Sequence, residues 1–157
     1  MKNLFIVLLT LTIATSACAQ VKVDQKKEAE ALMEANRQWA KAASPEAFFS
    51  FIRPDALMMA PDIGIAKGHE EMGKVLAGFQ ALPGFHITWE PQEAYVAGSG
   101  DLGYSVDRIL VSFDGEDGKK VEIYEKGLSV WKKDDQGDWK MAIDIWNVDT
   151  TINSIYK

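Results

Sequence analysis

Hydrophobic residues return at helical spacing in three stretches of the first half of the chain. Between residues 24 and 43 they recur every three or four positions opposite lysine and glutamate, which predicts an amphipathic helix. Ser44 is followed by proline and glutamate, residues typical of a helix start, so we expect a second, short helix over 45–53. Between 68 and 82 apolar residues keep i, i+3, i+4, i+7 spacing, and this pattern predicts a third helix.

From residue 85 onward the hydrophobic pattern is that of strands. We expect three long strands at 85–97, 101–113 and 121–132, because turns rich in glycine and aspartate separate them. Pro91 predicts a bulge or bend inside the first of these strands, since proline cannot donate a ladder hydrogen bond. A shorter strand is expected at 55–60, before the third helix.

The last predicted strand forms a hairpin with the strand before it, through an Asp/Gly turn at 134–137. Its alternating apolar row is Trp139, Met141, Ile143 and Ile145. The turn predicts that Val130 pairs with Met141, so Asp144 would lie on the other face of the sheet, opposite Gly127. Small residues around Asp144 leave volume there for a pocket.

The first residues have the pattern of an export signal. A lysine precedes an apolar run over 4–14, which is too short for a permanent membrane span, and Ala-Cys-Ala then offers a cleavage site before Gln20. Cys18 also resembles the cysteine of a bacterial lipobox, which would become lipidated. We therefore expect an export segment at 1–19 and one domain at 20–157, in the periplasm or outside the cell, either free or lipid-anchored.

Composition narrows the range of partners and chemistry. Cys18 is the single cysteine, so the expected mature domain has no disulfide, no thiolate nucleophile and no cysteine metal site. The formal net charge of −6 becomes one unit more negative when Lys2 is removed, which argues against nucleic acid as a partner. We expect no cofactor and no metal. His69 beside two glutamates is more typical of a solvated helix start.

Helices followed by an antiparallel meander indicate an α+β domain whose bent sheet wraps round its helices. Four motifs resemble the NTF2-like superfamily, and within it the SnoaL-like and DUF4440 proteins that include ketosteroid isomerase. They are 44–61 (SPEAFFSFIRPDALMMAP), 67–70 (KGHE), 100–104 (GDLGY) and 137–146 (GDWKMAIDIW). The resemblance implies an NTF2-like cone with N-terminal helices packed on a strongly bent antiparallel β-sheet. It specifies chemistry poorly, because the superfamily includes isomerases, dehydratases, cyclases, epoxide hydrolases and non-enzymes.

The resemblance to ketosteroid isomerase does not extend to its catalytic residues. Ala60 occupies the place of the proton-abstracting aspartate, and Asn36 corresponds to the donor tyrosine of the first helix. Without a carboxylate at position 60, that isomerase mechanism lacks its base. Asp144-Ile-Trp146 resembles the final-strand aspartate of the superfamily's epoxide hydrolases, but the Arg-x-Asp pair of those enzymes is missing.

The candidate site centres on Asp144 as a tentative general acid or base. Aromatic and flexible side chains could enclose an apolar ligand around it. These ligand-binding candidates are Trp39, Met58, Tyr104, Trp131 and Trp146. The alternative for Asp144 is a structural carboxylate bonded to the backbone, to Lys126 or to Arg108. The alternative for the aromatic residues is a place in the core or in a dimer interface.

Two functions fit this pattern. We favour a non-catalytic module that binds a small apolar molecule or a partner, because an acid–base enzyme normally needs two cooperating polar groups and Asp144 is one. The alternative is a small-molecule hydrolase, dehydratase or isomerase, which an enclosed pocket with a second acid or tyrosine near Asp144 would favour. We also expect a homodimer through the exposed face of the sheet, since tryptophans are expected on both faces.

Overall fold

The computed structural model describes residues 23–156, so the predicted export segment at 1–19 lies outside the described residues. In chain order the elements are α1 (Gln25–Ala40), α2 (Pro45–Ser50), β1 (Ile52–Met59), β2 (Ala66–Lys67), α3 (Gly68–Gln80), β3 (His86–Val96), β4 (Leu102–Asp114), β5 (Lys120–Lys133) and β6 (Trp139–Val148). The α+β class and the three predicted helices are confirmed. Asp24 caps α1 and Ser44 caps α2, each by accepting a backbone N–H at 3.2 Å.

The second helix is shorter than predicted, and the strand after it begins earlier. Helix α2 ends at Ser50, and Ile52 already belongs to β1, where it pairs with Met141 of β6. Ile52 is buried, so sheet pairing outweighs the local helical pattern. Pro54 lies in the stretch where the β1–β6 register breaks, and its missing N–H therefore costs no ladder bond there.

The six strands form one sheet in the order β2-β1-β6-β5-β4-β3. Strands β3 to β6 make the predicted antiparallel meander, whereas β1 runs parallel to β6. The predicted antiparallel meander is confirmed, and β1 makes the sheet mixed by adding one parallel pair. The local pattern of β1 predicts a strand but carries no information about which edge of the meander it joins.

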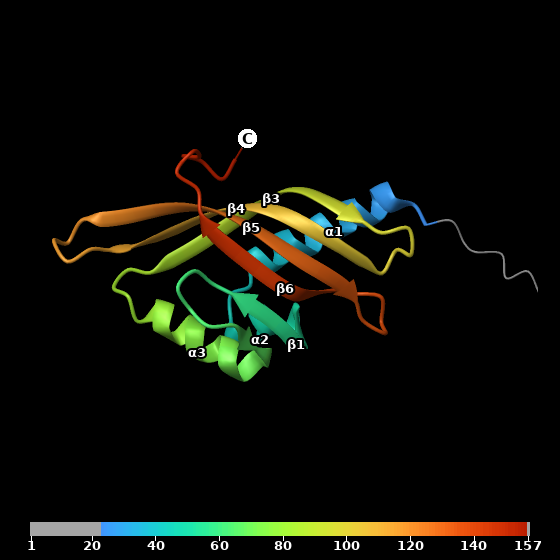
Figure 1. The fold of residues 1–157 in the computed structure, drawn as a ribbon, viewed down its shortest axis with the longest axis horizontal. Coiled ribbons are helices and arrows are strands. Elements are labelled where there is room, and N and C mark those ends of the chain that lie inside the picture. The colour runs from blue at the N-terminus through green and yellow to red at the C-terminus, as the bar shows by residue number, and fades with distance from the viewer. Residues whose placement is uncertain (1–22, 157) are drawn as a thin grey trace, which may run out of the picture.

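The helices cover one face of this sheet, which we call the inner face (Figure 1). No helix of residues 23–156 covers the opposite face, which we call the outer face. Helix α1 packs along β3 and β4, while α3 packs beside β1 and β2. Fully buried side chains between the layers include Leu32, Met72, Trp131 and Met141. These apolar contacts form the main core and hold the helices at the distance that leaves a cavity between them and the sheet.

Two β-bulges decide which side chains reach the inner face. The β3–β4 register shifts between Pro91 and Glu93, as Pro91 predicts. A second shift leaves Ala142 of β6 unpaired, because Trp131 pairs with Met141 but Val130 pairs with Ile143. One extra residue reverses the alternation of side chains, so β6 changes face in the middle of the strand.

The predicted register of the last hairpin was therefore wrong. Asp144 pairs with Ser129 rather than Gly127, and it lies on the same inner face as Met141. The outer face instead carries Ile143 and Ile145, which lie beyond the bulge. Trp131 and Trp139 belong to the inner core, so the expectation of tryptophans on both faces was also wrong.

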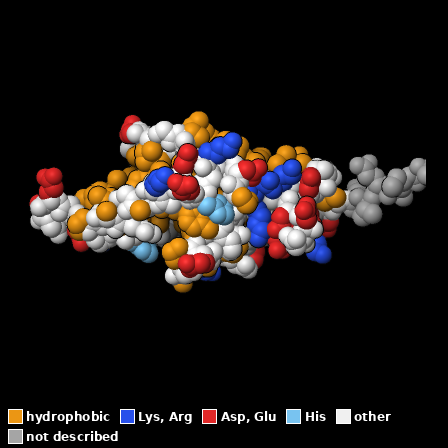
Figure 2. Space-filling view, turned by 90° about the horizontal axis from the view of Figure 1, so that it is seen from below, with side chains coloured by type: hydrophobic (Ala, Val, Ile, Leu, Met, Phe, Trp, Pro, Cys, Tyr) orange, Lys and Arg blue, Asp and Glu red, His pale blue; other side chains and the backbone are white. Residues whose placement is uncertain are grey.

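Basic and acidic side chains are interspersed on the side of the molecule that carries α2 and α3 (Figure 2). On that face the lysines and arginines do not gather into one patch. No helix within residues 23–156 is both long enough and apolar enough to cross a membrane.

Candidate functional site

A cavity of about 490 Å³ lies between the helices and the inner face of the sheet. Its walls come from α1, α2, β1, α3 and the four meander strands, and aromatic rings make up much of its surface. The rings belong to Trp39, Phe48, Phe49, Phe79, Phe85, Trp89 and Trp146. Among the described residues that line it, none is lysine, arginine or histidine. A cavity of this size and character suits a small, mainly apolar molecule.

The aromatic wall is built by short segments that converge on the end of α1. The ring of Trp39 lies 5.0 Å from that of Trp89 and 5.2 Å from that of Phe48, measured between centroids. The Trp39–Trp89 pair meets edge to face at 69°, an arrangement favoured by the quadrupoles of the rings. Ser44 caps α2 and Pro45 begins it, and Phe48 of this helix packs its ring against that of Trp39.

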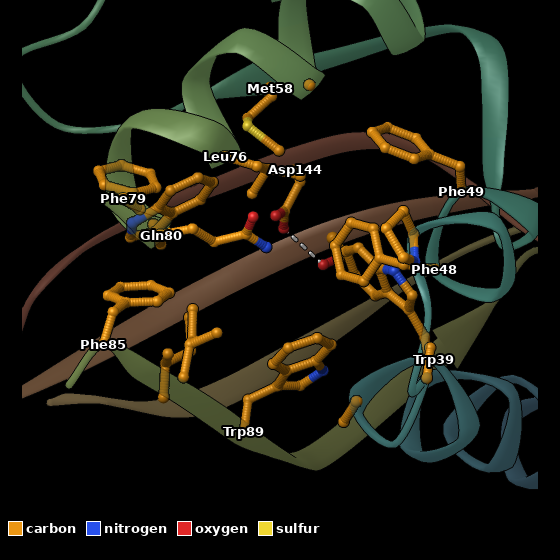
Figure 3. A pocket seen from close by; sticks show the side chains of 18 of the residues that line it. Trp39, Phe48, Phe49, Met58, Leu76, Phe79, Gln80, Phe85, Trp89 and Asp144 are labelled. Carbon is orange, nitrogen blue, oxygen red and sulfur yellow. Dashed lines mark hydrogen bonds between the residues drawn. The ribbon is translucent and has the colours of Figure 1, made fainter. Parts of the chain in front are cut away.

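Two carboxyl groups stand at the polar end of the cavity. Asp144 is partly exposed to the cavity, and the Ser129 hydroxyl donates to its Oδ1 at 2.8 Å (Figure 3). The same Ser129 Oγ lies 3.4 Å from Oδ2 of Asp107, whose residue is only 3% exposed. One serine hydroxyl therefore links a buried carboxyl group to one that faces the cavity.

Side chains of α1, β3, β4 and β5 form a chain of hydrogen bonds around Asp107. The Asn36 amide of α1 donates to Asp107 Oδ1 at 2.8 Å and to Ser105 Oγ at 2.9 Å. Trp89 Nε1 donates to Asn36 Oδ1 at 2.8 Å, and Trp131 Nε1 donates to Ser105 Oγ at 3.1 Å. An indole N–H can only donate, so Trp89 fixes which end of the amide faces Asp107.

We call these seven residues the Asp107 network. They are Asn36, Trp89, Ser105, Asp107, Ser129, Trp131 and Asp144.

Burial raises the pKa values of both carboxyl groups. Loss of hydration raises the pKa of Asp144 to about 6, although the Ser129 hydrogen bond acts in the opposite direction. For Asp107, burial and then the negative charge of Asp144 raise the pKa to about 7, against hydrogen bonds from Ser105, Ser129 and Asn36. Both groups thus titrate close to neutral pH, where a general acid or base is most effective.

The structure brings four of the six candidate residues to this cavity. Asp144, Trp39, Met58 and Trp146 line it. Trp131 does not, since it is fully buried behind the wall, where it packs edge to face on Trp39.

Tyr104 lies outside the cavity, because β4 directs Ser105 and Asp107 inward and Tyr104 outward. On the outer face its ring stacks with that of Tyr95, with centroids 5.7 Å apart.

The expected structural partners of Asp144 bind elsewhere. Lys126 lies 3.4 Å from Asp149, and Arg108 donates to the carbonyl groups of Ser154 and Tyr156. The ring of His69 lies within hydrogen-bond distance, 3.0 Å, of the Ile52 carbonyl. Residues 23–156 contain no cluster of three or more potential metal ligands.

Four residues of the site were not among the candidates predicted from the sequence: Ser129, Asp107, Trp89 and Gln80. Asp107 could have been found from Ser105 and Asp107 alternating within an apolar strand, a pattern that places two polar groups on one buried face. Gln80 ends α3 and extends its amide into the cavity toward Asp144 (Figure 3). Nothing in its local sequence distinguishes it from a surface glutamine.

No family model matches the sequence, and no curated protein matches it either. Solved structures do show the same fold. A ketosteroid isomerase-like protein from Erwinia carotovora atroseptica is 20% identical, with 79% of this chain and 98% of that chain covered and a TM-score of 0.69.

Two further solved structures are comparable. An NTF2-like protein with a cystatin-like fold from Novosphingobium aromaticivorans is 15% identical over 77% of this chain and 81% of that one, with a TM-score of 0.63. The CaMKII hub of S. rosetta is 21% identical, with 77% of this chain and 96% of that chain covered and a TM-score of 0.64.

Proposed function

Starting from the NTF2-like fold of this chain, we propose that the protein is an enzyme that moves a proton to or from a small apolar molecule, with Asp144 as the acid–base group. The observation that carries the proposal is the second carboxyl group, Asp107, linked to Asp144 through the Ser129 hydroxyl. The sequence alone favoured a non-catalytic module because it offered a single acidic candidate. The membership in DUF4440 stays a prediction.

The chemistry follows from the surroundings of Asp144. Above pH 6 its carboxylate can accept a proton from a bound molecule, and the aromatic walls pack against an apolar molecule held beside it. Within residues 23–156, no lysine, arginine or histidine lines the cavity to bind an anion. Gln80 lines the same cavity as Asp144 and offers an amide N–H to an oxygen atom of the substrate (Figure 3). These features favour an isomerase, a dehydratase or a hydrolase reaction on an uncharged substrate.

Exchange of a carbon-bound proton tests the proposal without knowledge of the native substrate. We expect the protein to catalyse deuterium incorporation into an apolar ketone such as 2-tetralone in heavy water. Mass spectrometry of the ketone measures the deuterium that it has gained. Asp144→Asn should slow this exchange by about 10²-fold or more while changing stability by at most about 2 kcal/mol. Asp149→Asn is the matched control, since Asp149 directly follows β6, the strand that carries Asp144, and forms an ion pair with Lys126. Binding of apolar probes without exchange or turnover would favour the non-catalytic module.

We further propose that a second copy of the chain covers the outer face. Large apolar side chains are exposed there on neighbouring strands, although an exposed sheet face is normally polar. They are Tyr95, Leu102, Tyr104, Leu128 and Ile145. The cross-strand pairs Tyr95–Tyr104 and Leu128–Ile145 make this patch continuous over four strands. One protein of the same fold is named as a hub and another as an association domain, which is consistent with assembly through this fold.

Export remains a proposal from the sequence of residues 1–19. Mass spectrometry of the mature N-terminus in the native host should find either Gln20 or an acylated Cys18 as the first residue. An intact Met1 on the accumulated protein would rule export processing out.

A further inference from the structure

The Ser129 hydroxyl has one proton to give to two carboxyl groups. Its shorter contact, 2.8 Å, is to Asp144 Oδ1, so the proton lies on that line. The longer contact, 3.4 Å to Asp107 Oδ2, is too long for a good hydrogen bond from the same hydroxyl. A proton on Asp107, donated to Ser129 Oγ, would strengthen this contact.

The other contacts of Asp107 are compatible with a proton in that place. Oδ1 accepts from the Asn36 amide at 2.8 Å, and Trp89 prevents that amide from turning round. Ser105 Oγ already accepts from Asn36 and Trp131, so its own proton points to Asp107 Oδ2 at 3.4 Å. Oδ2 can accept from Ser105 and still hold a proton directed at Ser129.

The charges around Asp107 also favour protonation. The groups that face it are Asn36 from α1, Trp89 from β3, Ser129 from β5 and Asp144 from β6, and Asp144 is the titratable one. Glu125 lies on the same face of β5 as Ser129, four residues earlier in the strand. No cationic side chain lines the cavity among the described residues. Two carboxylates separated by one hydroxyl repel each other, so a pair that retains one proton is more stable than a doubly ionised pair.

We propose that Asp107 is a proton reservoir for Asp144 and that Ser129 is the relay between them. This inference rests on the proposed function, in which Asp144 exchanges a proton with the bound molecule. Asp107 borders the cavity but is only 3% exposed, so in this proposal it is a positioning residue that acts on the bound molecule through Ser129. This role gives a reason for an ionisable carboxyl group at a position that is only 3% exposed.

The relay step conserves all atoms and electrons. The O–H bond of Asp107 breaks and its proton binds Ser129 Oγ, while the Ser129 proton passes to an oxygen of the Asp144 carboxylate. Asp107 ends as a carboxylate, Ser129 remains a hydroxyl and Asp144 becomes a neutral acid. Once Asp144 has given this proton to the bound molecule and later taken another from it, the reverse step returns that proton to the Asp107 carboxylate. Nothing is oxidised or reduced. The raised pKa values of both groups are consistent with such exchange at neutral pH.

Titration of ligand-free protein with ¹³C-labelled aspartate carboxyl groups locates the proton by NMR. If Asp107 keeps it, Asp144 ionises first, beside a neutral neighbour. Asp107→Asn should then leave the Asp144 midpoint in place and remove the second step from its titration curve. Asp144→Asn should lower the Asp107 midpoint by about one pH unit, a tenfold change in proton affinity. Glu125→Gln, another buried carboxyl group, is the control and should change neither midpoint.

The opposite pattern would overturn the inference. A lower Asp144 midpoint in Asp107→Asn, together with an unchanged Asp107 midpoint in Asp144→Asn, would mean that Asp144 holds the proton. Independent titrations in all variants would exclude the coupling. Because this measurement needs no substrate, it stands even when the exchange assay finds no activity.

A second measurement separates the reservoir from a merely structural role. In Asp107→Asn the amide can still donate to Ser129, but it cannot release a proton. The pH profile of deuterium exchange should rise as Asp144 ionises and fall as Asp107 ionises in the native protein. The variant should keep the rise and lose the fall. An unchanged profile in Asp107→Asn would show that Asp107 only supports the structure.

Discussion

At the scale of single residues, the raised pKa of Asp107 makes the fold less stable at neutral pH than at acid pH. Asp107 has a pKa of about 7 in the folded chain against an ordinary value of 3.8. Between these values the folded chain binds more protons than the unfolded chain, so this group stabilises the fold fully below about pH 4. That contribution is lost as the pH rises through about 7. The cost is consistent with a residue retained for proton chemistry rather than for folding.

Asp107→Asn should therefore be more stable than the native protein at pH 8, by up to about 4 kcal/mol, because the amide never has to ionise in the buried site. The difference should shrink toward pH 5. Urea unfolding at both pH values measures it. Asp55→Asn is a control with the opposite sign, since Arg53 lowers the pKa of Asp55. Parallel stability curves for Asp107→Asn and the native protein would contradict the assigned pKa.

At the scale of elements, the site depends on how closely α1 lies on β3 and β4. A Cβ atom at Gly103 would lie 2.6 Å from the Tyr95 carbonyl oxygen and 2.8 Å from Cδ1 of Leu32. Both are too short for real contacts, and the backbone carbonyl cannot move aside. Glycine at this position therefore permits the approach of α1, which carries Asn36 and Trp39 to the site.

Gly103→Ala should destabilise the fold by about 1–3 kcal/mol because it overpacks this contact. Gly98→Ala is the matched control from the same hairpin, where a Cβ atom meets nothing within 4 Å and should cost less than about 0.5 kcal/mol. Unfolding in urea compares the two. Equal effects would mean that the α1–β4 approach does not constrain the fold.

At the scale of the whole molecule, the outer face predicts association. Leu128→Lys places a charge in the centre of the proposed interface and should convert a dimer into a monomer in light scattering at micromolar concentration. Ile63→Lys is the matched control, because Ile63 is 42% exposed against 39% for Leu128 but lies on the loop between β1 and β2. A native protein that is monomeric at this concentration would refute the proposal.

Local sequence patterns were enough to predict the helices and the meander, with limits correct to within a few residues. Caps such as Ser44, a proline at the start of α2 and alternating apolar positions act over a few residues, so they can be read without the fold. Pro91 likewise predicts its bulge, because a missing N–H is a local property. Asp144 stood out because it interrupts an apolar strand.

The place of Asp144 in the site depends on long-range packing that no local pattern predicts. The bulge at Ala142 turns it to the inner face, and alanine has no local feature that predicts a bulge. Asp107 and Asn36 come together across 71 positions of sequence through packing of α1 on the sheet. The parallel pairing of β1 with β6 depends on the same long-range contacts. Such pairings follow from the burial of whole elements, and this is why the second carboxyl group of the site became visible only in the folded chain.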